Sequence, residues 1–207
     1  MDNKDITKAV LRSQHCQRNW DLSKEISPED LKLIEHAATQ CPSKQNLNFY
    51  ALNFITDRDM IESIHAVTKG FGHPIDESKP YSEENHVNHT NSQTLANLLV
   101  VIEYTPPSEF QEWRNIQFDD SWKRDADMAI GICAGYLNLT SSLKGYRTGC
   151  CACFDGEKVK EILGTKNDIA LMMGIGIHDE TRARREHHAT DFVFPSFKKE
   201  TVKVKHI

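Results

Sequence analysis

The 207-residue sequence contains no apolar run that approaches the ~20 residues an α-helix needs to cross a bilayer. Its N-terminal stretch, "MDNKDITKAVLRSQ", lacks the charged and then apolar pattern of a signal peptide. Neither sign of charge is in large excess, since 25 basic side chains stand against 30 acidic ones. This balance gives no electrostatic footprint for nucleic acid or an anionic membrane. We therefore expect a cytoplasmic protein that binds neither nucleic acid nor membranes.

The six cysteines lack the spacing of a disulfide framework, so we expect them to be thiols and mostly small buried residues. "GCCACF" with nearby histidines raises zinc as an alternative, because cysteine and histidine are preferred zinc ligands. However, the segment has no C-x-x-C pair, and Cys150, Cys151 and Cys153 are too close together to surround a tetrahedral ion easily. Gly174 and Gly176 fall within a predicted strand without the third glycine of a dinucleotide-binding fingerprint. A Rossmann site is therefore not predicted.

Hydrophobic periodicity predicts helices and strands in a single domain spanning residues 1–207. One helix should begin at Ser27, a capping residue followed by Pro28, and end at Cys41 and Pro42. Further helices are predicted at 60–69, 125–144 and 157–164. Strands are predicted at 50–56, 96–104, 169–177 and 200–207.

The segment 125–144 is apolar on nearly every side, which is typical of a helix that is buried all round. In a chain of this length, burial against a second subunit is the more economical arrangement. The terminal "ETVKVKHI" alternates apolar and charged residues, as a half-exposed strand does. Such a strand must pair with an edge of its own sheet or of a neighbour's.

Three other segments have little regular pattern. Residues 70–93 read as an irregular loop, which at that length usually carries function. The aromatic-rich segment 106–124 contains two pairs at helical spacing, Phe110 with Trp113 and Phe118 with Trp122. These aromatics either cover a substrate channel or belong to the core. "DETRARREHH", at 179–188, is predicted to be a solvated basic segment, and its two histidines are expected at the surface.

Two polar clusters next to apolar elements are candidates for a binding site: "QHCQRNWD" at 14–21 and "PSKQN" at 42–46. Each combines a cationic donor with amide, hydroxyl or imidazole groups. Together with the arginines of 182–185 they offer groups that suit a phosphate and a polar heterocycle.

The order of these features resembles that of the nitroreductase family of FMN-dependent oxidoreductases. "QHCQRNWD" follows the second half of the family's opening motif, and "PSKQNLNFY" is similar to its Pro-Ser-x-x-Asn signature. Pro42, Ser43 and Asn46 match, whereas Asn48 and Phe49 stand where Gln and Pro usually occur. "GCCACFDGEKVKEILG" and "LMMGIGIHDETRARR" resemble later family segments, so the likeness spans nearly the whole chain.

The resemblance implies an α+β homodimer with a central, mostly antiparallel sheet flanked by helices. The long buried helix 125–144 would form the dimer core. The C-terminal strand would be exchanged between subunits.

The resemblance also implies that Arg18 lies beside N1 and O2 of the flavin ring, where a fixed cation favours the reduced state. Gln14 stands where the family usually has a phosphate-binding arginine, which places more of that role on Arg182, Arg184 or Arg185. An alternative alignment begins the motif at Arg12 and Ser13, with three residues inserted before Trp20. The other implied cofactor-binding residues are His15 and Cys16 at the phosphate and ribityl chain, Pro42, Ser43, Lys44 and Asn46 from the other subunit, Asn91 and Gln93 at the ring, and the backbone of Ala152 and Cys153 near N5.

The activity that the resemblance implies is ping-pong transfer of reducing equivalents from NAD(P)H through FMN to a small acceptor such as a nitroaromatic or quinone. One alternative is a specialised member of the family, such as a reductive dehalogenase or a flavin-consuming enzyme. Another is a flavin-free structural or binding dimer, which the departures at Gln14, Cys16 and Phe49 would suit. A zinc module is the remaining alternative.

Overall fold

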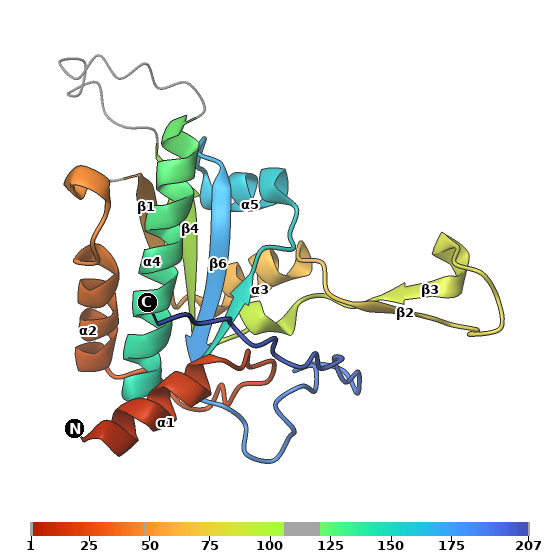
Figure 1. Ribbon diagram of the computed structural model, residues 1–207. Helices are drawn as coiled ribbons and strands as arrows, with labels where there is room; N and C mark the ends of the chain where they lie inside the picture. The colour runs from red at the N-terminus through yellow and green to blue at the C-terminus, as the bar shows by residue number, and fades with distance from the viewer. Residues whose placement is uncertain (1, 48, 106–120, 207) are drawn as a thin grey trace.

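The computed structural model describes residues 2–47, 49–105 and 121–206. Its centre is a four-stranded sheet in which every neighbouring pair is antiparallel (Figure 1). In spatial order the strands are β1 (Tyr50–Ile55), β4 (Leu98–Tyr104), β6 (Ile169–Gly176) and β5 (Arg147–Cys151). The predicted α+β class and antiparallel sheet are thus confirmed.

Helices cover both faces of this sheet (Figure 1). On one face, α2 (Pro28–Thr39) and α4 (Ser121–Leu143) pack against alternate side chains of β4 and β6. On the other face, α3 (Arg58–Ala66) and α5 (Gly156–Leu163) pack against the intervening side chains. Because both faces are covered, β4 and β6 are almost continuously apolar and buried, as expected for central strands.

Local capping explains where several helices begin and end. The Ser27 hydroxyl accepts from the Asp30 N–H at 3.1 Å, and Pro28 supplies the first helical residue of α2. At α5, the Asp155 side chain caps the start, and Gly164 ends the helix in the left-handed conformation with φ of +66°. None of the described helices is both long and apolar enough to cross a membrane.

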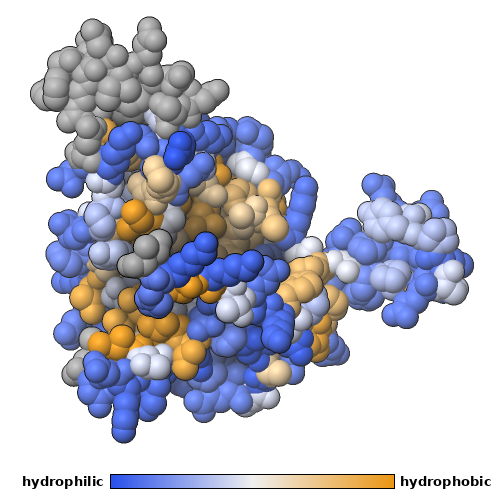
Figure 2. All heavy atoms as spheres, in the orientation of Figure 1, coloured by the Kyte–Doolittle hydropathy of each residue, from blue (hydrophilic) through white to orange (hydrophobic). Residues whose placement is uncertain are grey.

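One face of α4 is open in this chain. Four apolar residues at helical spacing, each 38% to 49% exposed, form a stripe along it: Met128, Ile132, Tyr136 and Leu139. Figure 2 shows apolar side chains gathered over this part of the molecule. Burial of α4 on every side is therefore not achieved within one subunit, and its expected burial against a second subunit remains a prediction.

Several segments differ from the sequence-based expectations. Residues 70–93 are more ordered than predicted: β2 (Gly72–Pro74) and β3 (His86–Asn88) form a hairpin that projects from the body (Figure 1). The short 3-10 helices η2 (Glu83–Asn85) and η3 (Ser92–Thr94) flank β3. The hairpin forms because the buried Asn85 side chain bonds both Asp76 N–H and Asp76 C=O, which closes the turn.

The terminal strand is not present within this subunit, where residues 195–206 are exposed and have no regular structure. Its exchange with a second subunit stays a prediction. The helix α1 (Asn3–Ser13), the strand β5 and the 3-10 helix η1 (Lys44–Asn46) were not predicted. The expected cover segment 106–124 lies outside the described residues except for its last four, which begin α4.

Candidate active site

A cavity of about 520 Å³ opens beside the outer edge of β5. It lies between the segment after α1, the base of the β2–β3 hairpin, η3 and the C-terminal segment. Five of the predicted cofactor-binding residues line it: Arg18, Asn91, Gln93, Ala152 and Cys153. The fold therefore brings together groups that are up to 135 positions apart in the sequence.

The segment that carries Arg18 is anchored to the sheet on both sides of this residue. The Gln17 N–H donates to the Thr148 carbonyl of β5 at 2.8 Å. The buried Trp20 indole donates from Nε1 to the Ser92 carbonyl at 2.8 Å. Arg18 is thereby held between β5 and η3, facing the cavity.

Two glycines allow this close packing. A Cβ atom on Gly174 of β6 would lie 1.9 Å from the Gln93 carbonyl oxygen, and one on Gly149 of β5 would lie 2.9 Å from the Gln17 carbonyl oxygen. Any side chain at either position would push η3 or the Arg18 segment off the sheet. Gly174 of "GIG" thus serves packing, and it lies within β6, where no nucleotide-binding turn is formed.

The free edge of β5 contributes backbone groups to the cavity. In an antiparallel strand, alternate residues direct their N–H and C=O to the same edge. Thr148 directs its carbonyl to this edge, where it meets Gln17, so Cys150 presents its own N–H and C=O to the same side. Cys150 lines the cavity, which can therefore offer backbone hydrogen bonds to a planar ligand.

The cavity is positively charged. Its lining includes Arg18 and Lys69 but, among the described residues, no carboxylate. Arg18 Nη1 lies 3.4 Å from Asn91 Oδ1, and its Cζ lies 4.0 Å from the centre of the Phe194 ring. Burial, as the largest cause, lowers the pKa of the Arg18 guanidinium, which nevertheless stays charged at neutral pH. This combination suits an electron-rich or anionic ligand.

Two of the three thiols in the lining, those of Cys150 and Cys151, are not nucleophiles at neutral pH. Burial raises the pKa of Cys150 to about 12 and that of Cys151 to about 11. Cys151 Sγ also accepts from Asn91 Nδ2 at 3.1 Å, which orients the amide. Within the described ranges, no three His, Cys, Asp or Glu side chains gather as a set of metal ligands. Neither Cys150 nor Cys151 thus offers a thiolate to this cavity.

Comparison with known proteins identifies the fold and the family. The sequence model of the nitroreductase family matches residues 11–177. This chain belongs to the nitroreductase family. The match includes the Arg18 segment, the packing glycines Gly149 and Gly174 and the backbone at 150–153, whereas the C-terminal segment after residue 177 lies outside it.

Solved structures of the family share this fold. A protein from Exiguobacterium sibiricum, described as a nitroreductase in complex with FMN, is 16% identical with a TM-score of 0.63, over 97% of this chain and 94% of that one. One from Staphylococcus epidermidis, described as an NAD(P)H:FMN oxidoreductase, is 17% identical with a TM-score of 0.64 over the same shares. A nitroreductase family protein from Streptococcus pneumoniae is 15% identical with a TM-score of 0.62, over 96% of each chain. Curated protein sequences give no match.

Other residues that the family resemblance assigned to the cofactor lie around the cavity or away from it. Arg184 Nη1 donates to the Cys16 carbonyl at 2.9 Å, while Gln14 and His15 are exposed after α1. Arg182 and Arg185 are engaged within their own segment, where they donate to backbone carbonyls including that of Phe194. Of the three arginines, Arg184 is therefore the one tied to the Cys16 segment.

The Pro42–Asn46 segment does not reach this cavity within the subunit. Lys44 pairs with Asp125 in the first turns of α4, whereas the Ser13 carbonyl accepts from Asn138 Nδ2 at 3.0 Å near the other end. Asp125 and Asn138 are about 20 Å apart along the helix axis. In one chain the two predicted halves of the family's cofactor site are therefore separated.

Seven lining residues were not predicted to bind the cofactor: Lys69, Gly70, Phe71, Cys150, Cys151, Phe154 and Phe194. Phe194 and His187 are also fully or almost fully buried, so the expectation of a solvated surface at His187 is wrong. The reason is an aromatic cluster in which His187 stacks parallel to Phe194 at 5.9 Å. The short apolar run "FVF" at 192–194 is the signal that could have indicated a packed segment.

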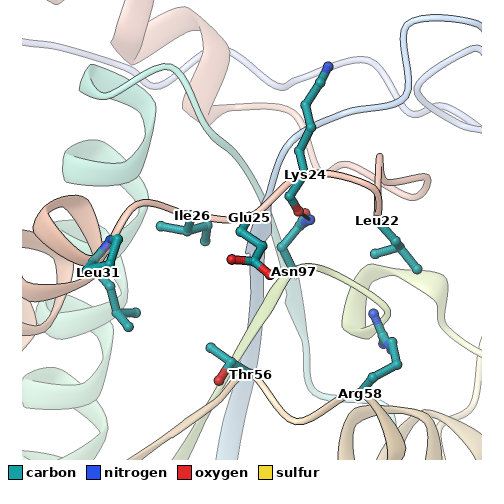
Figure 3. A pocket seen from close by; sticks show the side chains of 9 residues that line it. Leu22, Lys24, Glu25, Ile26, Leu31, Thr56, Arg58 and Asn97 are labelled. Carbon is teal, nitrogen blue, oxygen red and sulfur yellow. Dashed lines mark hydrogen bonds between the residues drawn. The ribbon is translucent and has the colours of Figure 1, made fainter.

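A second cavity, of about 510 Å³, lies near the start of α3. In Figure 3, Ile26 and Leu31 stand on one side of it and Leu22 and Arg58 on the other. None of the predicted cofactor-binding residues lines it. The β5 cavity is therefore the candidate active site of this nitroreductase family member.

Proposed function

We propose that this protein is a flavin oxidoreductase that binds FMN in the β5 cavity. The observation that carries the proposal is the convergence of five predicted FMN-binding residues on one positively charged cavity, in a chain of the nitroreductase family. The similar structure from Exiguobacterium sibiricum is described as a complex with FMN, which supports the same cofactor here.

The lining fits an isoalloxazine ring. The ring is flat and carries carbonyl and N–H groups along one edge, and the cavity offers the Asn91 and Gln93 amides together with the free backbone edge at Cys150. Phe71, which is partly exposed at the cavity, adds an apolar face. A single arginine without a neighbouring carboxylate matches a ligand that gains negative charge on reduction.

FMN, when bound, would supply the electron-transfer chemistry itself. Arg18 would stay protonated and place its fixed charge beside the part of the ring that becomes negative. Asn91, oriented by Cys151, would help fix the position of the ring. Cys150 and Cys151 would remain as neutral thiols and take no covalent part.

NAD(P)H is the proposed electron donor, and a small acceptor such as a nitroaromatic or quinone the proposed oxidant. We propose ping-pong order because donor and acceptor would use the same cavity in turn.

The proposed assembly is a homodimer. The open apolar stripe on α4 needs cover, and a second copy of the same helix provides an apolar surface of matching extent. If two α4 helices pack antiparallel, the segment around Lys44 of each subunit moves towards the Arg18 segment of the other. This arrangement would join the two halves of the site that lie about 20 Å apart along α4 in one chain.

The test is spectroscopic. We expect the purified protein to be yellow, or to gain flavin absorbance when FMN is added, and to bleach anaerobically with NADH or NADPH. Arg18→Ala should weaken FMN binding or slow its reduction at least about tenfold, the effect of roughly 1.4 kcal/mol. Lys32→Ala, which removes an exposed charge on α2, is the control and should behave as wild type.

A colourless protein that binds no added FMN would overturn the proposed function. Unchanged FMN affinity and kinetics in Arg18→Ala would show that the cofactor lies elsewhere.

A further inference from the structure

Phe194 stands out because it is buried directly before an exposed C-terminal segment. Its side chain is 0% exposed, whereas residues 195–206 are exposed throughout. It lies 17 residues beyond the end of the match to the family model, yet its ring lines the candidate active site. A tail residue that enters the site in this way needs specific contacts to hold it.

Those contacts are reciprocal and involve both backbone and ring. The Phe194 N–H donates to the Arg185 carbonyl at 2.9 Å, and Arg185 Nη1 donates back to the Phe194 carbonyl at 2.9 Å. The ring meets Phe192 edge-on at 5.0 Å and Phe71 edge-on at 6.1 Å, and it stacks on His187. The position of the ring is therefore fixed from several directions.

The ring face lies against the Arg18 guanidinium, whose Cζ is 4.0 Å from the ring centre. Arg18 makes no ion pair in the part of the chain that the structure describes, and its one polar contact there, to Asn91, is long at 3.4 Å. A carboxylate in the place of Phe194 would hold the arginine but would also neutralise it. An aromatic face attracts the cation through its quadrupole and leaves the full charge available to a ligand.

We propose that Phe194 is a positioning residue that holds Arg18 towards the flavin without neutralising it, and that it thereby sets the preference of the site for reduced FMN. This inference rests on the proposed FMN site. It assigns to the tail beyond residue 177 a role in tuning the cofactor.

The first test compares reduction potentials of bound FMN. Phe194→Leu keeps an apolar side chain but removes the ring, and should weaken the preference for reduced over oxidised FMN about three- to tenfold, which makes the two-electron potential about 15 to 30 mV more negative. Phe194→Tyr keeps the ring and should retain the wild-type potential. Phe197→Leu is the control, since Phe197 belongs to the same tail, contacts Phe71 and is 76% exposed.

A purely structural role for Phe194 would lower thermal stability in Phe194→Leu and leave the potential at the wild-type value. That result would overturn the proposal. An equal shift in Phe197→Leu would overturn it as well, because the effect would then belong to the tail as a whole.

A second test needs no flavin and no variant that alters packing. A proton above the face of an aromatic ring resonates upfield, so the Arg18 Nε–H signal of the cofactor-free wild-type protein should be shifted upfield in an NMR spectrum. Arg18→Lys assigns the signal by its loss. A signal at the usual arginine position would overturn the positioning role, whereas an upfield signal in a protein that binds no FMN would overturn the proposed function and still support the Arg18–Phe194 contact.

Discussion

The packing of η3 on β6 can be tested by replacing Gly174 with alanine. The added Cβ would lie 1.9 Å from the Gln93 carbonyl oxygen and 3.0 Å from the Ala96 Cβ. Ordinary contact begins at 3.4 Å, so the backbone of η3 would have to move by about 1.5 Å, the difference between 3.4 Å and 1.9 Å. A backbone oxygen cannot be relieved by a change of rotamer, so the strain must spread into β6 or η3.

Overpacking of this kind typically costs 1 to 3 kcal/mol, and we expect about 3 kcal/mol here because the clash is with backbone. For a domain of this size the loss corresponds to a decrease of about 6 to 12 °C in Tm. The movement would also displace Gln93 and Asn91, so FMN affinity should fall together with stability. The measurement is a thermal unfolding scan at fixed protein concentration, followed by an FMN titration.

Two other glycines make a graded comparison. Gly149→Ala brings its Cβ to 2.9 Å from the Gln17 carbonyl oxygen and should cost less, while Gly156→Ala meets nothing within 4 Å and should leave Tm within a few degrees of wild type. A Gly174→Ala protein that melts within 2 °C of wild type, or that loses no more stability than Gly156→Ala, would refute the packing argument. For a domain of this size, a shift of 2 °C in Tm corresponds to about 0.5 to 1 kcal/mol of unfolding free energy.

Two further predictions concern the histidine cluster and the surface of α4. Burial, as the largest cause, and then the nearby His187 lower the pKa of His65 from 6.5 to about 4. Because His65 binds a proton more readily in the unfolded protein, the free energy of unfolding should fall by roughly 3 kcal/mol as pH decreases from 6.5 towards 4. In urea titrations, His65→Gln should flatten this decrease. An unchanged pH profile in the variant would contradict this origin. Ile132→Asp places a charge in the apolar stripe of α4 and should convert the proposed dimer to monomer in sedimentation velocity, whereas Met60→Asp, at a similarly exposed position on α3, should not. A monomeric wild-type protein would remove the dimer proposal.

Much of the fold could be predicted because its signals are local. Ser27 with Pro28 marks the start of α2, Gly164 marks the end of α5, and the apolar runs at 98–104 and 169–176 are strands. The order of the two polar motifs and the later segments indicated the nitroreductase family, which the match over residues 11–177 confirms. Arg18, Asn91 and Gln93, which that resemblance assigned to the cofactor, line one cavity, and their binding of FMN stays a prediction.

One missed element, the strand β5, depends on a distant partner. "RTGCC" has the glycine and cysteines of a loop, yet β5 forms because β6 offers its edge along Arg147–Cys151. The C-terminal "ETVKVKHI" shows the opposite case, since its strand-like alternation finds no partner among the described strands of its own subunit.

The sequence by itself determined the helix caps, the buried central strands and the family, because capping, periodicity and motif order act within a few residues. Only the tertiary structure decided that Phe194 and His187 are buried. Their neighbours in sequence are polar or exposed. Burial comes from residues more than 100 positions away: Phe194 packs on Arg18 and Phe71, and His187 lies beside His65. Long-range contacts of this kind leave no periodic pattern, so the tail's part in the site could be found only once the chain was folded.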